Sequence, residues 1–139
     1  MTELKNSFYS CLDPKVVAPQ SEQHALITQT AIDNEGLVVF YGAEDYFCAS
    51  NQPFIYNKLK RTPNLDGVIF FTINQFCYGE EINMKLILEI IELGLSVHFA
   101  REKLNILDFE SFCEHFLEMR AYAHAQKKGA LHENPGITG

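Results

Sequence analysis

Short apolar segments alternate along this chain with longer segments of helical periodicity, and this alternation limits the possible folds more than any other feature. The apolar segments are rich in aromatic and β-branched residues and end near Pro, Gly, Asn or Asp, which is typical of strands. These expected strands lie at residues 8–12, 37–41, 68–72 and 96–100. Apolar spacing and capping residues predict helices at 21–33, 53–59, 82–93 and 108–126.

Strands and helices in this order predict an α/β fold. Right-handed crossovers between such strands place a parallel sheet between two layers of helices. We therefore expect a three-layer, four-stranded parallel sheet in the order 2-1-3-4, with helices on both faces and a further C-terminal helix. The continuous apolar run at 37–41 predicts a strand that is covered on both faces.

The length of the chain favours one domain. With 139 residues, of which 47% are apolar, a single domain at 1–128 can bury a core without disulfides or a structural metal. Residues 129–139 contain Asn-Pro-Gly and little to bury, which predicts a flexible tail.

Composition argues against several classes of partner and cofactor. Eleven Lys and Arg against eighteen Asp and Glu give a net charge of −7, which disfavours binding to nucleic acid. The N-terminal residues show no targeting pattern, and charged residues interrupt the apolar stretch 82–100, so we expect a cytoplasmic protein without a membrane span. The four cysteines are widely spaced, and no phosphate-loop or metal-ligand motif occurs, so we expect reduced thiols, no metal and no cofactor.

The predicted topology also places a candidate site. Ligands of open parallel sheets bind beyond the carboxyl ends of the strands, where the strand order reverses. In the order 2-1-3-4 this point lies between the first and third strands. The candidate pocket residues on the loops and strand ends gathered there are Cys11, Asp13, Lys15, Asp45, Tyr46, Asn74, Gln75, Tyr78, His98 and Glu102.

Each candidate has a structural alternative. Asp13 precedes a proline and favours a turn as much as an acid, and Cys11 is a nucleophile only if a cation such as Lys15 stabilises its thiolate. His98 lies in an apolar strand and is either a hydrogen-bonded core imidazole or a catalytic acid or base. Glu102 either orients His98, binds a substrate, or is solvated.

The C-terminal helix carries an apolar stripe. Its members recur at spacings of three and four and are Phe109, Phe112, Phe116, Met119 and Tyr122. The stripe either covers the edge of the sheet or pairs with its copy in a second subunit, and both can hold together. We therefore expect a homo-oligomer, with these residues as candidates for a dimer interface.

Four stretches carry a resemblance to a known family. These stretches occur in the same order as in the catalytic domain of serine recombinases. They are Tyr9 with the polar loop after it, the helix after Pro19, the segment Asp-Gly-Val-Ile-Phe-Phe-Thr-Ile-Asn-Gln-Phe at 66–76 and the segment 87–104. The chain resembles these resolvases and invertases over residues 7–106. This resemblance implies a resolvase-like fold and a helix-mediated dimer.

The same resemblance argues against DNA cleavage. The position of the family's serine nucleophile falls on Asp13, and that of the arginine two residues earlier falls on Cys11. The paired arginines that clamp the phosphate fall on Gln75 and Tyr78. Because each matched phosphate-handling residue is replaced, the resemblance implies the fold without strand cleavage.

A second resemblance is to a small, sporadically distributed family of bacterial proteins encoded in surface-carbohydrate clusters. It lies at Tyr9-Ser10, at Pro19-Gln20 with Gln23, at Ala43 with Asp45-Tyr46 and at 65–68. It is closest in Ser-Val-His-Phe-Ala at 96–100 followed by Glu102 and Leu104. The chain departs from this family at 11–15 and 74–79. The resemblance implies a role in making or modifying the sugars of lipopolysaccharide or capsule.

Three functions follow as hypotheses. The first is an accessory or ligand-binding protein of surface-polysaccharide biosynthesis that binds a sugar or nucleotide sugar or assists a pathway enzyme; a single local cation, Lys15, disfavours a diphosphate ligand. The second is a small enzyme that acts on a sugar or sugar nucleotide and uses His98 as acid or base with Glu102 or Asp45. The third is a structural dimer or adaptor.

Overall fold

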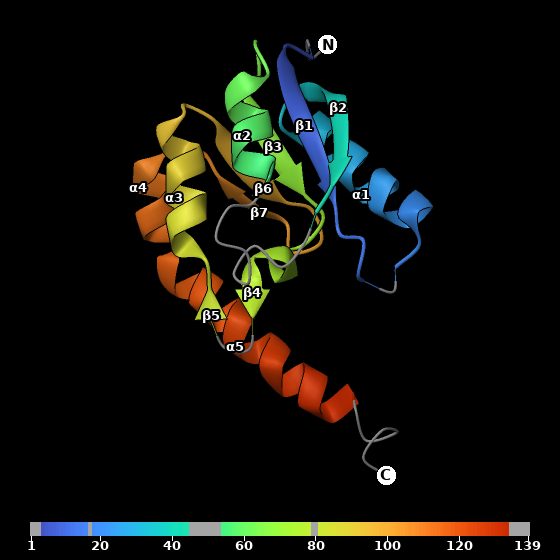
Figure 1. The fold of residues 1–139 in the computed structure, drawn as a ribbon, viewed down its shortest axis with the longest axis vertical. Coiled ribbons are helices and arrows are strands. Elements are labelled where there is room, and N and C mark those ends of the chain that lie inside the picture. Colours follow the sequence, from blue (N-terminus) through green and yellow to red (C-terminus); the bar gives the residue numbers. More distant parts are fainter. Residues whose placement is uncertain (1–3, 17, 45–53, 79–80, 134–139) are drawn as a thin grey trace.

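The computed structural model describes residues 4–16, 18–44, 54–78 and 81–133 (Figure 1). The strands are β1 (Asn6–Leu12), β2 (Gly36–Ala43), β3 (Gly67–Phe70), β4 (Cys77–Tyr78), β5 (Glu81–Ile82), β6 (Ser96–Phe99) and β7 (Leu104–Ile106). The helices are α1 (Gln20–Asp33), α2 (Phe54–Arg61), the 3₁₀ helix η1 (Ile73–Phe76), α3 (Met84–Glu92), α4 (Phe109–Glu114) and α5 (Phe116–Glu133). None of the helices described here has the length and apolar character needed to cross a bilayer.

The central sheet has the order β2-β1-β3-β6-β7. Its first four strands are parallel and correspond to the four expected strands in the expected order, which confirms the α/β fold. The fifth strand, β7, pairs antiparallel with β6 and was not expected. It follows a tight turn in which Lys103 adopts φ 56°. Because β7 has only three residues, it is too short to give a periodic signal in the sequence.

Strand β2 differs from its expected environment. The prediction that both of its faces are covered is wrong, because Leu37, Val39, Phe40 and Tyr41 are exposed. β2 is an edge strand, and its register with β1 shifts between Phe8 and Tyr9. Irregularities of this kind disrupt an open edge and oppose pairing with other chains.

Two separate apolar clusters hold the helices on the sheet. On one face, Phe8, Ile69 and Phe71 pack against Ile27 and Ala31 of α1. The larger cluster occupies the other face and joins the sheet to α2, α3, α4 and α5. Figure 1 shows α1 on one side of the sheet and α3 and α4 on the other, so the three-layer arrangement is as predicted.

The C-terminal helix is interrupted. Asp108 begins α4 by accepting a hydrogen bond from the Ser111 amide at 2.8 Å, as its predicted capping role requires. The expected continuous helix at 108–126 is wrong, because α4 ends at Glu114, His115 forms a turn, and α5 starts at Phe116. No Gly or Pro marks this break in the sequence. α5 then continues to Glu133, past residue 129 where the tail was expected to begin, and projects beyond the sheet (Figure 1).

Candidate functional site at the carboxyl edge of the sheet

The Gln75 side chain is the centre of the predicted site. It is 1% exposed, and its Nε2 donates to the carbonyl oxygens of Cys11 at 3.3 Å, Leu12 at 3.1 Å and Glu44 at 2.8 Å. Its Oε1 accepts a hydrogen bond from the Thr72 amide at 3.0 Å, which completes a capping box on η1. One amide therefore ties the ends of β1 and β2 to the segment that follows β3.

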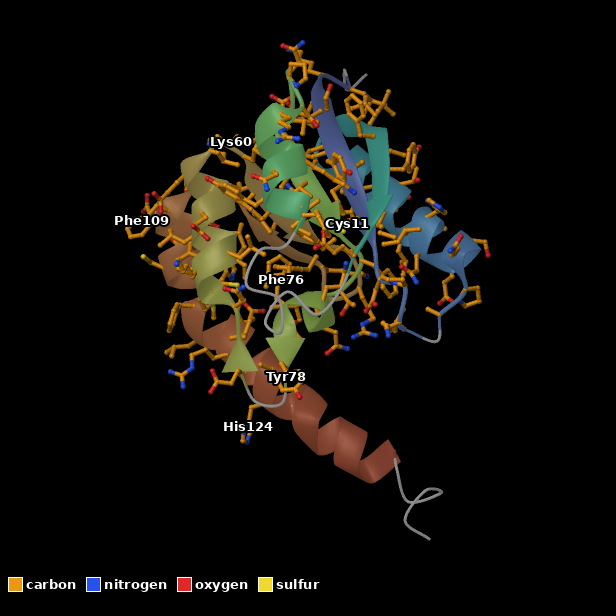
Figure 2. The ribbon with its side chains drawn as sticks, viewed as in Figure 1. Cys11, Lys60, Phe76, Tyr78, Phe109 and His124 are labelled. Atoms are coloured by element: carbon orange, nitrogen blue, oxygen red, sulfur yellow. The ribbon has the colours of Figure 1, made fainter. Side chains whose placement is uncertain are left out.

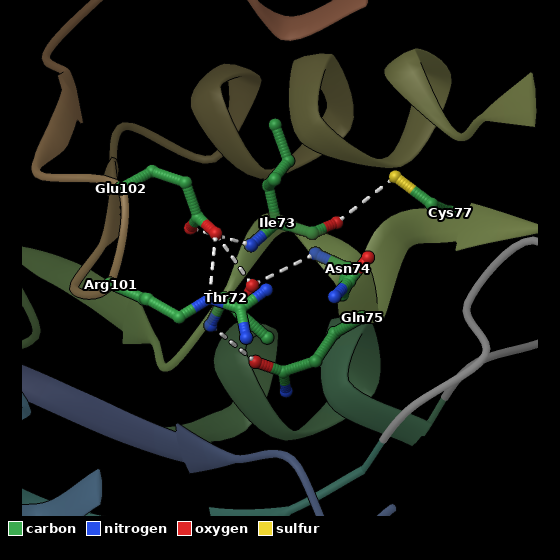
Figure 3. Close-up of polar contacts among 7 residues, drawn as sticks. All are labelled: Thr72, Ile73, Asn74, Gln75, Cys77, Arg101 and Glu102. Atoms are coloured by element: carbon green, nitrogen blue, oxygen red, sulfur yellow. Dashed lines mark hydrogen bonds and ion pairs between the residues drawn. The ribbon is translucent and has the colours of Figure 1, made fainter. Parts of the chain in front are cut away.

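Glu102 occupies the other side of η1 (Figure 3). Its carboxylate accepts hydrogen bonds from the Thr72 hydroxyl at 2.7 Å and from the Ile73 amide at 3.0 Å. Arg101 Nε donates to the same carboxylate at 3.1 Å, and its guanidinium lies over the Phe71 ring. Glu102 thus anchors the start of η1 and neutralises Arg101.

Asp13 forms the turn after β1. Its carboxylate accepts a hydrogen bond from the Lys15 amide at 2.9 Å, the turn-forming role that a residue before proline suggests. Gln23 of α1 accepts from the Asp13 amide and donates to the Asp13 carbonyl oxygen. Burial raises the pKa of the Asp13 carboxyl, an effect that the Lys15 hydrogen bond opposes. Asp13 and Gln75 lie at the same edge of the sheet, as predicted, since Gln75 bonds to the residue that precedes Asp13.

Cys11 lies in the interior rather than at an accessible strand end (Figure 2). Burial, with a further contribution from the Glu44 carboxylate, raises the pKa of the Cys11 thiol to about 12. A nucleophilic cysteine requires a stabilised thiolate. The nucleophile hypothesis for Cys11 is therefore wrong.

We expect Cys11 to be almost inert to iodoacetamide at pH 8 in the folded protein. Relative to an ordinary thiol of pKa 9.0, a pKa of about 12 lowers the thiolate fraction roughly 1,000-fold. Timed labelling followed by peptide mapping measures this rate, with the exposed Cys113 as an internal control. Labelling of Cys11 as fast as Cys113 in folded protein contradicts this account.

His98 does not belong to the carboxyl-edge site. It lies within β6, 1% exposed, and its nearest side-chain partners are Ser96 at 2.8 Å and Asn105 at 2.7 Å. Glu102 bonds to η1 instead, so the two side chains do not form the expected acid and base pair. Burial lowers the pKa of His98. The prediction of His98 as a catalytic residue is wrong, and its alternative, a hydrogen-bonded core imidazole, is correct.

The remaining candidates are scattered. Lys15 and Tyr78 are exposed, and Tyr78 lies on β4 near α5 (Figure 2). Asn74 is half-buried, with its backbone amide donating to the Thr72 hydroxyl. Asp45 and Tyr46 lie outside the described residues. The structure therefore brings together Cys11, Asp13 and Gln75, with Glu102 on the far side of η1.

Several residues of this edge were missed by sequence reasoning. Gln23, Thr72 and Arg101 take part in its hydrogen bonds, and the backbone carbonyl of Glu44 accepts from Gln75. The one signal that points to them is the pattern Thr-x-x-Gln at 72–75, which is a capping box just after a strand. Chemically, the edge is a closed network of amides and carbonyl oxygens in which the Arg101 cation is already paired.

The apolar stripe of the C-terminal helices mostly faces the core. Phe112 and Met119 are buried, and Phe116 and Tyr122 pack partly buried against the same cluster. Phe109 is exposed. The expectation that the stripe covers the sheet is confirmed for Phe112, Phe116, Met119 and Tyr122 but not for Phe109, while the expectation of a dimer stays a prediction.

The fold was compared with known proteins. No family model matches the chain, and no curated protein is similar to it. Among solved structures, a resolvase family site-specific recombinase from Streptococcus pneumoniae superposes with a TM-score of 0.52 at 12% sequence identity, covering 94% of this chain and 99% of that chain. At this identity the likeness extends to the fold alone, so the chain has a resolvase-like α/β fold.

Proposed function

We propose that this chain is a ligand-binding or accessory protein of bacterial surface-polysaccharide biosynthesis, for lipopolysaccharide or capsule, and has no recombinase activity. The observation that carries the proposal is the environment of Gln75. At a position where the resemblance to recombinases implies a phosphate-binding arginine, a neutral amide bonds to three carbonyl oxygens of the protein itself. Both hydrogens of Gln75 Nε2 are used by these carbonyl oxygens, so none is left for a phosphodiester.

The electrostatics of the edge support the same proposal. The Arg101 guanidinium at this edge is paired with Glu102, and the chain carries a net charge of −7. A protein that grips DNA needs several unpaired cations against the phosphates. A neutral ligand is therefore better matched to this chain than a nucleic acid or a nucleotide diphosphate.

The polysaccharide part of the proposal comes from the resemblance at 96–104. In the structure this segment forms β6, the following turn and the start of β7. Its conspicuous residues have definite structural partners, since His98 bonds to Ser96 and Asn105, and Glu102 bonds to η1. The segment therefore shapes the surface at the end of the sheet without supplying a catalytic group.

Calorimetric titration of the whole chain with monosaccharides, sugar phosphates and nucleotide sugars tests the proposal. We expect saturable binding of at least one sugar and no nicking of supercoiled plasmid DNA. Plasmid nicking, or a panel without binding and without co-purification of a polysaccharide-pathway enzyme, contradicts the proposal.

A structural dimer is a second candidate, favoured by exposed apolar residues at the start of the C-terminal helices. Leu107, Phe109 and Leu117 are 60%, 59% and 75% exposed. Sedimentation of a Phe109→Glu/Leu117→Glu variant checks this function. An unchanged mass and an unchanged fold remove this surface as an interface.

A further inference from the structure

A cavity of about 250 Å³ lies between α1 and the turn from β6 to β7, on the face of the sheet opposite α2 and α3. Asp33 and Asn34 at the end of α1 line one side, and Ala100, Lys103 and Asn105 line the other. This volume is below the ~300 Å³ at which pockets for drug-sized molecules begin. The cavity therefore suits a ligand with a single ring.

The two amides of this cavity are held in fixed orientations. Asn105 Oδ1 accepts hydrogen bonds from His98 Nδ1 at 2.7 Å and from Asn34 Nδ2 at 3.2 Å. Because a carbonyl oxygen can only accept, Nδ1 carries the imidazole proton and Nε2 accepts the Ser96 hydroxyl hydrogen. The hydrogen-bond chain from Ser96 to Asn34 thus fixes which end of each amide is bonded within the protein.

The other end of each amide has no hydrogen-bond partner among the described residues. Both hydrogens of Asn34 Nδ2 are used, on the Thr30 carbonyl and on Asn105, which leaves its Oδ1 as an acceptor. Asn105 uses its Oδ1 and leaves its Nδ2 as a donor. An acceptor and a donor on two hydrogen-bonded amides match hydroxyl groups, each of which both donates and accepts.

The charges of the lining balance. Asp33 accepts a hydrogen bond from Gln29 at 2.9 Å and retains further lone pairs. The Lys103 ammonium forms no ion pair with any residue that the structure describes. Lys103 is also held at φ 56°, a conformation disfavoured for residues other than glycine. One cation and one anion beside neutral amides favour an uncharged polar ligand over a phosphate.

We propose that this cavity binds a neutral monosaccharide, with Asn34, Asn105, Asp33 and Lys103 bonding to its hydroxyls and the partly buried Leu26 contacting its C–H groups. This inference rests on the proposed function, because it names the place and class of sugar that the chain binds. The Ser96–His98–Asn105 chain then has a definite task, which is to hold the recognition amides in place before the ligand arrives.

The test titrates the full chain with glucose, galactose, mannose, rhamnose and N-acetylglucosamine, and with UDP-glucose and inorganic phosphate as charged probes. We expect one neutral sugar to bind and an Asp33→Ala/Lys103→Gly variant to bind it at least 10-fold more weakly. Glycine suits the positive φ at 103, so the variant is expected to retain the fold. A Glu89→Ala/Lys60→Ala variant is the matched control, because it also removes one anion and one cation, here from α3 and α2 away from the cavity. This control is expected to keep the affinity of the unmodified chain.

Unmodified protein gives a second measurement. Addition of the sugar is expected to shift the side-chain amide NMR signals of Asn34 and Asn105 more than that of Asn74. Unchanged affinity in the cavity variant with unshifted Asn34 and Asn105 signals overturns the location, while the proposed function stands. Binding of UDP-glucose without any monosaccharide overturns the ligand class. Absence of binding to every sugar overturns this inference, and it overturns the proposed function as well only if no polysaccharide-pathway enzyme co-purifies with the chain.

Discussion

A Gln75→Glu substitution is expected to destabilise the protein by more than about 3 kcal/mol at pH 7. The new carboxylate keeps an oxygen for the Thr72 amide, but its other oxygen faces the carbonyl oxygens of Cys11, Leu12 and Glu44. It places a buried, unpaired charge among three acceptors. Urea unfolding followed by circular dichroism measures the change in the free energy of unfolding.

The pH dependence of this variant gives a further check. Burial raises the pKa of the introduced carboxyl in the folded state, so its protonated form, which again donates a hydrogen bond, is stable at low pH. Stability therefore recovers as the pH falls towards 5. Asn74→Asp is the matched control, because the Asn74 side chain is half-buried with no hydrogen bond of its own among the described residues. Equal, small losses in both variants contradict the central role of Gln75.

The second large effect is a loss of stability on acidification that depends on His98. The pKa of the folded imidazole lies below its ordinary value of 6.5 because the ring is buried. The unfolded chain therefore takes up a proton as the pH falls through 6.5, while the folded chain does not. Stability contributed by this residue is complete above pH 6.5 and is lost below it, by at most about 1.4 kcal/mol per pH unit.

Comparison of variants isolates this effect from other titrating groups. The free energy of unfolding is measured from pH 7.5 to pH 5 for the unmodified chain, for His98→Leu and for His124→Leu, in which a surface histidine of α5 is replaced. We expect His98→Leu to be less stable at neutral pH and to show a flatter slope below pH 6.5. A slope equal to that of the unmodified chain contradicts the assignment of a neutral, buried His98.

The fold was largely predictable because its strands carry strong local signals. The apolar runs that became β1, β3 and β6 place the carboxyl ends of neighbouring parallel strands at one edge, and this was enough to predict that Asp13 and Gln75 lie there together. β2 has the same apolar composition, yet its residues are exposed. Composition alone does not distinguish a central strand from an edge strand, because that depends on which strands pair.

The roles within the site were less predictable because they depend on contacts between distant segments. Gln75 finds its acceptors at the ends of β1 and β2, and nothing near it in sequence indicates them. His98 was included in the candidate pocket for a related reason. Its partner Asn105 lies on β7, and without that short strand the sequence offers no hydrogen-bond partner across the sheet.

The reversal of the chain at β7 determines the direction in which α4 and α5 run relative to the sheet. A fifth parallel strand would return the chain to the carboxyl edge, and the helices after it would run away from that edge. Because β7 runs antiparallel, α4 begins at the opposite end of the sheet, and α5 runs back past η1 and the paired strands β4 and β5 (Figure 1). The described end of α5 therefore lies on the carboxyl side of the sheet, and the start of β1 lies on the opposite side (Figure 1).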